Sequence, residues 1–176
     1  MADLLWDDVK CAFCADVMGT LPDVYVPETS VDDWQAVLDL VEVNGWQYRY
    51  SEGDTVLPLP RAESVLSRPD DAECPQLRVR PTPDVLAIFR FHAAEEIDFD
   101  VDLRELQGQQ RLDVFCGFLS AIGRRLGKPV LMDAEGGDGS RPVLGFDAAS
   151  DQMVVLTDLP CHADAKTPPT DTHPHT

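Results

Sequence analysis

Two segments of the chain carry apolar residues at the spacing of an amphipathic helix. The first covers 31–43, with Ser30 as its cap and Asn44-Gly45 at its end, and its apolar stripe consists of Trp34, Val37, Leu38 and Val41. The second covers 109–126 and ends at Gly127, and its apolar stripe consists of Leu112, Phe115, Leu119, Ile122 and Leu126. Weaker helical patterns predict short helices within 3–18 and around 61–67.

Short alternating or apolar segments predict the strands. They are 46–50, 77–80, 85–92, 97–103, 129–135, 142–147 and 153–157. We therefore expect a single α+β domain over 1–159, in which an antiparallel or mixed sheet of about six to seven short strands carries two main helices. Residues 1–22 are expected to form a peripheral helix. The segment 160–176 has almost no large apolar residue and is expected to be a disordered tail.

The register of one hairpin follows from its apolar positions. Those of 85–92 and 97–103 are all odd-numbered, and Phe89 and Phe99 are examples. Because directly paired residues of an antiparallel ladder point to the same face, paired numbers must sum to an even value. The sequence thus predicts a loop of three or five residues around 93–96. It also places Arg90 and His92 on one face with Asp98, Asp100 and Asp102.

Charge narrows the choice of partners. The chain has 32 acidic and 14 basic residues and a formal net charge of −18, which opposes binding to nucleic acid or to anionic lipid. Residues 1–59 hold 12 of the acids and only two bases, Lys10 and Arg49. A protein partner is therefore expected to be basic, unless the charge serves only solubility. The candidate partner-binding residues are Asp32, Asp39, Glu42, Trp46, Tyr48, Asp98, Asp100 and Asp102.

The cysteine content and the hydropathy of the chain indicate in which cellular compartment the protein is found. An odd number of cysteines, five, and a start without a leader pattern argue against secretion and a disulfide framework. No apolar run is long enough to span a bilayer, so a cytoplasmic location is expected. Arginine greatly outnumbers lysine, as in GC-rich bacteria. Cys11 and Cys14 have the CxxC spacing of redox and zinc sites, but no second pair accompanies them, and a core or half-exposed role is favoured.

No arrangement of residues indicates catalysis. The three aspartates at 98, 100 and 102 could contribute to a divalent-cation site, with His92 nearby, if further ligands converged. No second acidic or histidine cluster accompanies them, and no nucleophile turn or phosphate-binding glycine motif is present. We therefore predict no catalytic residue, no metal site and no cofactor. A small metal-dependent enzyme that uses the aspartate row is the alternative.

The chain resembles small acidic bacterial immunity proteins, which neutralise a toxin by binding it. The resemblance lies in IDFDVDL, LDVFCGFLSAIGRRLGKPV and PVLGFD, together with the low pI, and covers most of residues 30–157 in style. It includes no diagnostic motif, so no functional residue is carried over from it. It implies a protein-binding inhibitor whose acidic face meets a basic partner such as a nuclease toxin. An accessory subunit of a bacterial complex is a further alternative.

Overall fold

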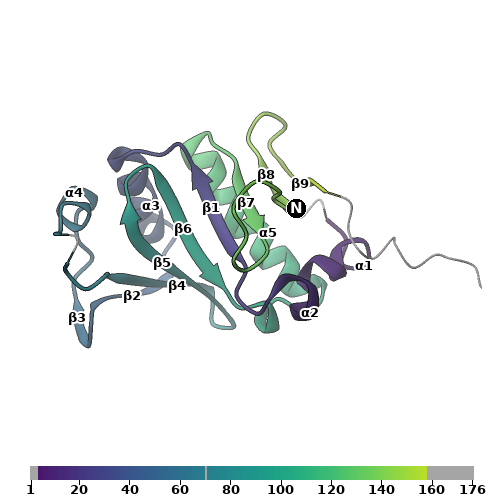
Figure 1. Ribbon diagram of the computed structural model, residues 1–176, viewed down its shortest axis with the longest axis horizontal. Helices are drawn as coiled ribbons and strands as arrows, with labels where there is room; N and C mark the ends of the chain where they lie inside the picture. The colour runs from purple at the N-terminus through teal and green to yellow at the C-terminus, as the bar shows by residue number, and fades with distance from the viewer. Residues whose placement is uncertain (1–3, 70, 158–176) are drawn as a thin grey trace, which may run out of the picture.

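The computed structural model describes residues 4–69 and 71–157. Its strands form one antiparallel sheet in the order β3-β2-β4-β5-β6-β1-β7-β8-β9 (Figure 1). Within the described residues the strands are β1 (Asp23–Pro27), β2 (Gln47–Glu52), β3 (Thr55–Leu57), β4 (Gln76–Thr82), β5 (Val85–Ala93), β6 (Glu96–Val101), β7 (Val130–Asp133), β8 (Leu144–Asp147) and β9 (Gln152–Val155). The protein is thus a single α+β domain. Its sheet is antiparallel rather than mixed, with nine strands instead of the six to seven expected.

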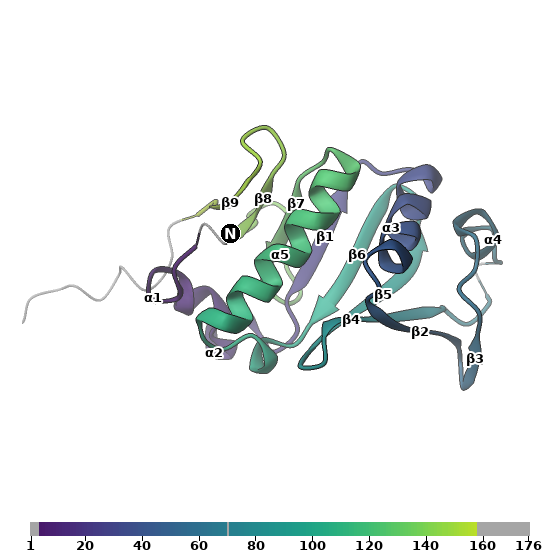
Figure 2. The same cartoon turned by 180° about the vertical axis from the view of Figure 1, so that it is seen from behind.

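Helices lie on one face of this sheet. Both main helices, α3 (Val31–Val43) and α5 (Gln109–Leu126), have the predicted bounds, and Figure 2 shows them in front of the strands. A capping box between Ser30 and Asp33 begins α3, and Gly127 ends α5 in the left-handed conformation. The short helix α4 (Ala62–Leu66) packs beside α3. The amphipathic patterns therefore predicted which elements form the helical layer.

The core lies between these helices and the sheet. Odd-numbered residues of β5 and β6 point into it, and Phe89 and Phe99 stack there with ring centroids 4.6 Å apart. Phe118 of α5 makes edge contacts with both rings, which joins the helix to the central strands. Trp34 of α3 is fully buried, and its indole N–H donates to the carbonyl of Ala93 at 3.0 Å. Helices and hairpin thus share one core.

The sequence pattern missed the strand that joins the two halves of the sheet. β1 has five residues and lies between β6 and β7, so it pairs on both sides. Its Val24 and Val26 are fully buried. The segment is short and ends at a proline, and therefore resembled a connection between helices. The three-residue edge strand β3 was missed for the same reason.

The N-terminal segment is a series of three short turns rather than one helix. These are α1 (Trp6–Val9), the 3₁₀ helix η1 (Lys10–Phe13) and α2 (Ala15–Met18). Cys14 separates the last two because its backbone is extended. Val9, Phe13 and Met18 are buried, and the Phe13 ring meets Phe115 of α5 edge-on. This segment contributes to the main core.

The β5–β6 hairpin has the predicted register but not the predicted loop. Phe89 pairs with Phe99, and Arg90 pairs with Asp98. In both pairs the two residue numbers sum to an even value, as predicted. At the turn, however, Ala93 pairs with Glu96, so the loop has two residues, and a bulge then restores the parity. The expectation of a three- or five-residue loop was wrong.

Two other expectations concern the ends of the chain and the membrane. The predicted tail, 160–176, lies outside the described residues. Across 4–69 and 71–157, no helix combines the length and the apolar character that crossing a membrane requires.

Candidate functional site: an acidic hollow on the open sheet face

The face of the sheet opposite the helices carries polar residues. Alternation places the even-numbered positions of β5 and β6 there, among them Arg90, Asp98 and Asp100. On β1 the odd positions Asp23 and Tyr25 point the same way, because Val24 and Val26 enter the core. Figures 1 and 2 show α3 and α5 on the other side only. We call this surface the open face.

A loop between β7 and β8 folds over one end of the open face. Asp133, at the end of β7, accepts hydrogen bonds from the backbone N–H groups of Ala134 at 2.8 Å and Gly139 at 2.9 Å. The hydroxyl of Tyr25 donates to the carbonyl of Gly139 at 3.1 Å. Gly137 packs so closely on the Asp133 carboxylate that a side chain there would collide with it. A buried aspartate thus anchors the loop 134–140.

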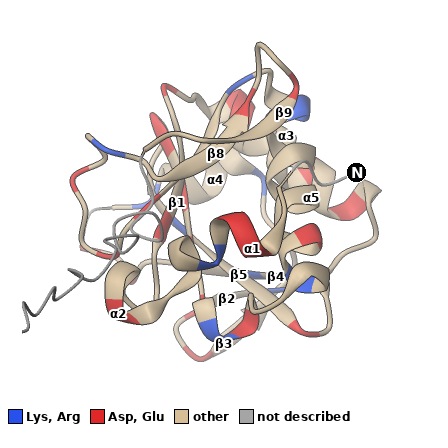
Figure 3. Ribbon diagram, turned by 90° about the vertical axis from the view of Figure 1, so that its right-hand side faces the viewer, with Lys and Arg blue, Asp and Glu red and all other residues tan. Residues whose placement is uncertain are grey.

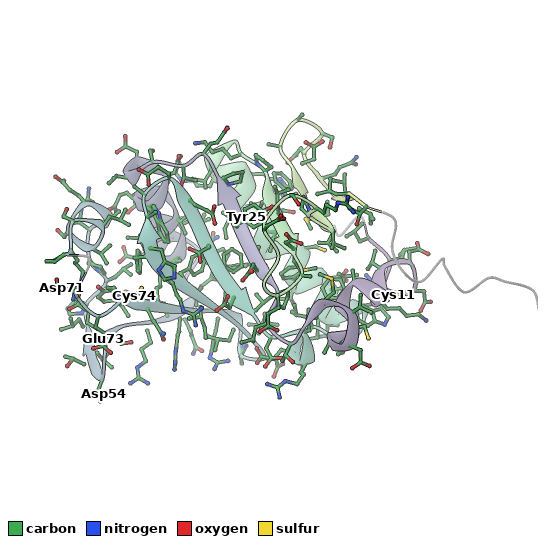
Figure 4. All side chains as sticks on the ribbon, in the orientation of Figure 1. Cys11, Tyr25, Asp54, Asp71, Glu73 and Cys74 are labelled. Carbon is green, nitrogen blue, oxygen red and sulfur yellow. The ribbon has the colours of Figure 1, made fainter. Side chains whose placement is uncertain are left out.

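The loop and the strands enclose a hollow of about 260 Å³. Its lining residues are Asp23, Tyr25, Glu96, Asp98, Asp133, Gly137, Asp138 and Gly139. Five of these eight residues carry a carboxylate, so we call it the acidic hollow. In Figure 4 Tyr25 marks its position on β1, in the middle of the sheet.

Strand register brings the carboxylates together. Asp23 lies between Asp100 of β6 and Asp133 of β7, its direct partners on either side. Tyr25 is in turn the direct partner of Asp98. Like charges on opposed positions repel, so this arrangement costs stability unless a cation compensates it.

The surroundings make two of these carboxyls harder to ionise. Burial is the main cause that raises the pKa of Asp23, and the charges of Asp133 and Glu135 add to it against a hydrogen bond from the Gly136 backbone. Burial likewise raises the pKa of Asp98, which His92 and Arg90 partly oppose. A positive group in the hollow would therefore lower both pKa values.

The predicted aspartate row does not act as one unit. Asp100 forms an ion pair with Arg90. Asp102 lies beyond the end of β6, where it caps the 3₁₀ helix η2 (Leu103–Glu105) and binds the Arg104 guanidinium at 2.7 Å. Only Asp98 lines the hollow. Across the described part of the chain, no group of three histidine, cysteine or acidic side chains is placed to hold a metal ion.

His92 lies at the bulge of β5. It is exposed, and its Nδ1 is 3.8 Å from the Cys74 sulfur. In Figure 4 Cys74 marks this corner, on the side of the molecule that carries β3 and α4. The charge of His92 lowers the pKa of Asp98 and so places the imidazole near the first aspartate of the row, whereas Asp102 lies beyond the end of β6.

The N-terminal candidates lie on a different surface from the hollow. Asp32, Asp39 and Glu42 belong to α3, behind the sheet as seen from the open face. Trp46 is half-buried against the Phe118 ring, and 43% of Tyr48 is exposed. Figure 3 shows acidic segments on several sides of the molecule, including α1 and α2. The eight predicted partner-binding residues thus do not form one acidic face.

The CxxC cysteines are not a dithiol pair. Cys14 is a free, exposed thiol, whereas Cys11 is disulfide-bonded. Cys11 lies at the N-terminal end of the molecule, far from the labelled Cys74 (Figure 4). The spacing alone therefore described neither a metal site nor a redox motif.

Sequence reasoning missed Asp23, Tyr25 and Asp133. The available signal was the alternation in DVYVP, which places Asp23 and Tyr25 on one face once it is read as a strand. Comparisons with models of protein families, with curated proteins and with solved structures find no match for the chain. Function is therefore argued from this geometry.

Proposed function

We propose that this protein is a protein-binding inhibitor of the immunity type, which uses the acidic hollow to bind a basic partner such as a nuclease toxin. The observation that carries the proposal is the convergence of Asp23, Asp98 and Asp133 on one enclosed hollow in which two pKa values are raised. Such a cluster costs stability in the free protein. A basic side chain from a partner would relieve it.

The size and shape of the hollow suit one long basic side chain. Its 260 Å³ correspond to roughly eight or nine water molecules at about 30 Å³ each. The Tyr25 ring and the glycines of the loop provide apolar walls for an aliphatic stem, and the carboxylates receive its charged end. The net charge of −18 adds attraction over distance and raises the association rate. An inhibitor of this kind covers the phosphate-binding residues of its target.

The test uses an arginine-rich peptide as the probe. Binding is measured by calorimetry at roughly 50 and 200 mM salt, where screening differs strongly. The double variant Asp23→Asn with Asp98→Asn should bind the peptide about tenfold more weakly than the wild type. The matched control, Asp39→Asn with Glu42→Gln, removes two charges from α3 and should change the affinity much less.

Two results would contradict the proposal. Equal weakening by both double variants would mean that only total charge matters. A larger loss in the α3 variant would move the binding surface to the helical layer. A partner identified by native pull-down should then be lost from the Asp23/Asp98 variant and retained by the control, and its activity should be inhibited by the wild-type protein.

A further inference from the structure

A second hollow lies over β2, β4 and β5 on the open face. It has a volume of about 580 Å³, and its lining residues are Gly45, Trp46, Gln47, Tyr48, Arg49, Arg78, Arg80 and Leu86. We call it the arginine hollow. β5 and β6 separate β4 from β1, so these two strands lie about 14 Å apart across the sheet at a strand spacing near 4.8 Å. Nothing in the proposed function uses it.

Register concentrates positive charge in this hollow. Arg49 of β2 is the direct partner of Arg78 of β4, and Gln47 is the direct partner of Arg80. Directly opposed like charges destabilise a ladder. Three guanidinium groups and one amide are thus placed within two neighbouring cross-strand pairs, at a cost to the fold.

The arginines of the hollow, like Arg61, Arg125 and Arg141, form no ion pair with a described acidic side chain. Over the described ranges, Arg68, Arg90, Arg104, Arg111 and Arg124 each form an ion pair with an acidic side chain. Arg49, Arg78 and Arg80 form none with described residues, although the chain has 32 acids. Arg80 is instead held by the Pro83 carbonyl, to which it donates at 3.1 Å. Anion-binding groups therefore remain available.

The backbone leaves this hollow accessible from the side. β3 pairs only with Tyr50–Glu52, so residues 47–49 form an edge of the sheet. The β4–β5 ladder is interrupted between Val79 and Thr82, so Arg80 pairs with Gln47 of β2 but has no regular partner on β5. A ligand can thus approach the guanidinium groups both over the face and past the edge.

We infer that the arginine hollow is a binding site for a small phosphorylated molecule. Guanidinium groups donate paired hydrogen bonds to phosphate oxygens, and phosphate offers more acceptors and more charge than a single carboxylate. The half-buried Leu86 lies on the same face as the arginines and supplies an apolar wall for an organic group. Phosphate on the arginines and an apolar group beside Leu86 are the interactions that this lining provides.

The probes are inorganic phosphate and adenosine monophosphate, titrated by calorimetry into the full chain. We expect the nucleotide to bind with a dissociation constant below about 1 mM and phosphate to bind more weakly. Arg78→Gln should weaken both by about tenfold or more. Arg125→Gln, at an exposed arginine of α5 on the helical side, is the matched control and should change neither. The Arg78→Gln variant should fold normally, because the substitution removes the repulsion between the directly paired Arg49 and Arg78.

Leu86→Ala separates the two sources of phosphate. Weaker nucleotide binding with unchanged phosphate binding supports an organic phosphate as the ligand, and no change in either assigns the site to free phosphate. The absence of saturable binding overturns the inference, as does equal weakening by Arg125→Gln. Self-association that Arg78→Gln abolishes would also overturn it, because the arginines would then serve a contact between copies.

Discussion

Arg90 of β5 forms its ion pair with Asp100 rather than with Asp98, its direct partner on β6. The guanidinium thus reaches diagonally along the open face. Asp98 is left beside Asp23 and Glu96, where its pKa is raised chiefly by burial. Because of this one diagonal contact, Asp100 forms an ion pair whereas Asp98 lines the acidic hollow.

Neutral variants of the two aspartates should behave differently. Asp100→Asn leaves the half-buried Arg90 without its charged partner, and we expect the free energy of unfolding to fall by about 1 to 3 kcal/mol. Asp98→Asn removes a carboxylate that the fold disfavours and should cost little or add stability. Urea unfolding of both variants checks the difference. Equal losses would mean that Arg90 interacts with both aspartates alike.

The effect of Asp98 on stability should depend on pH. Its pKa in the folded protein lies above the ordinary value of 3.8, so the folded state holds more protons than the unfolded chain between these two values. Stability therefore falls as the pH rises through this window. Asp98→Asn removes the effect, so its gain over the wild type should be present at neutral pH and vanish below about pH 3.8.

Asp102 provides a control of opposite sign. Its hydrogen bonds from the Arg104 side chain lower its pKa, and this carboxylate therefore stabilises the fold above pH 3.8. That contribution is lost as the pH falls through the lowered value. Asp102→Asn should thus lose stability at neutral pH and approach the wild type in acid. Thermal unfolding of both variants over a pH series would show the two trends, and parallel curves would contradict the assignment.

The hairpin shows how far residue parity can be trusted. The apolar residues of β5 and β6 do share a face, because burying Phe89 and Phe99 together outweighs a regular ladder. If the ladder were regular, the even sum of paired residue numbers would require a loop with an odd number of residues. The chain instead makes a two-residue turn and places Phe91 and His92 opposite Ile97. Periodicity predicted the face but could not choose between a longer loop and a bulge, since both satisfy the same core.

The candidate sites depended on tertiary information that periodicity lacks. Helix spacing was enough for α3 and α5, whose long stripes match their burial. The acidic hollow needed β1 between β6 and β7, and the paired residues of these strands are 69 or more positions apart in the sequence. It also needed the loop held by Asp133. Neither feature has a local signature, and so Asp98 was found while Asp23 and Asp133 were not.

Leu119 lies at the centre of the buried stripe of α5 and is fully inaccessible to solvent. Leu119→Ala should lower the free energy of unfolding by about 2 to 5 kcal/mol, because it removes buried methyl groups and leaves a cavity. Denaturant unfolding measures the loss. A value below about 1 kcal/mol would mean that neighbouring side chains refill the space.

Two glycines of α5 should respond to alanine in opposite directions. Gly123 is buried, and a methyl group there would collide with the ring of Phe146, which is itself only 1% exposed and cannot move into solvent. Gly117 lies on the exposed side of the same helix, with nothing within 4 Å of the position of a Cβ. Both changes improve helix propensity by about 0.5 to 1 kcal/mol.

Gly117→Ala should therefore raise the free energy of unfolding by about this amount. At Gly123 the overpacking penalty, about 1 to 3 kcal/mol, should exceed the gain and destabilise the protein. The two variants have the same composition and differ only in what the added methyl group meets. Chemical unfolding of both, compared with the wild type, isolates the contact between α5 and β8. Stabilisation by Gly123→Ala would show that α5 can move away from Phe146 without loss.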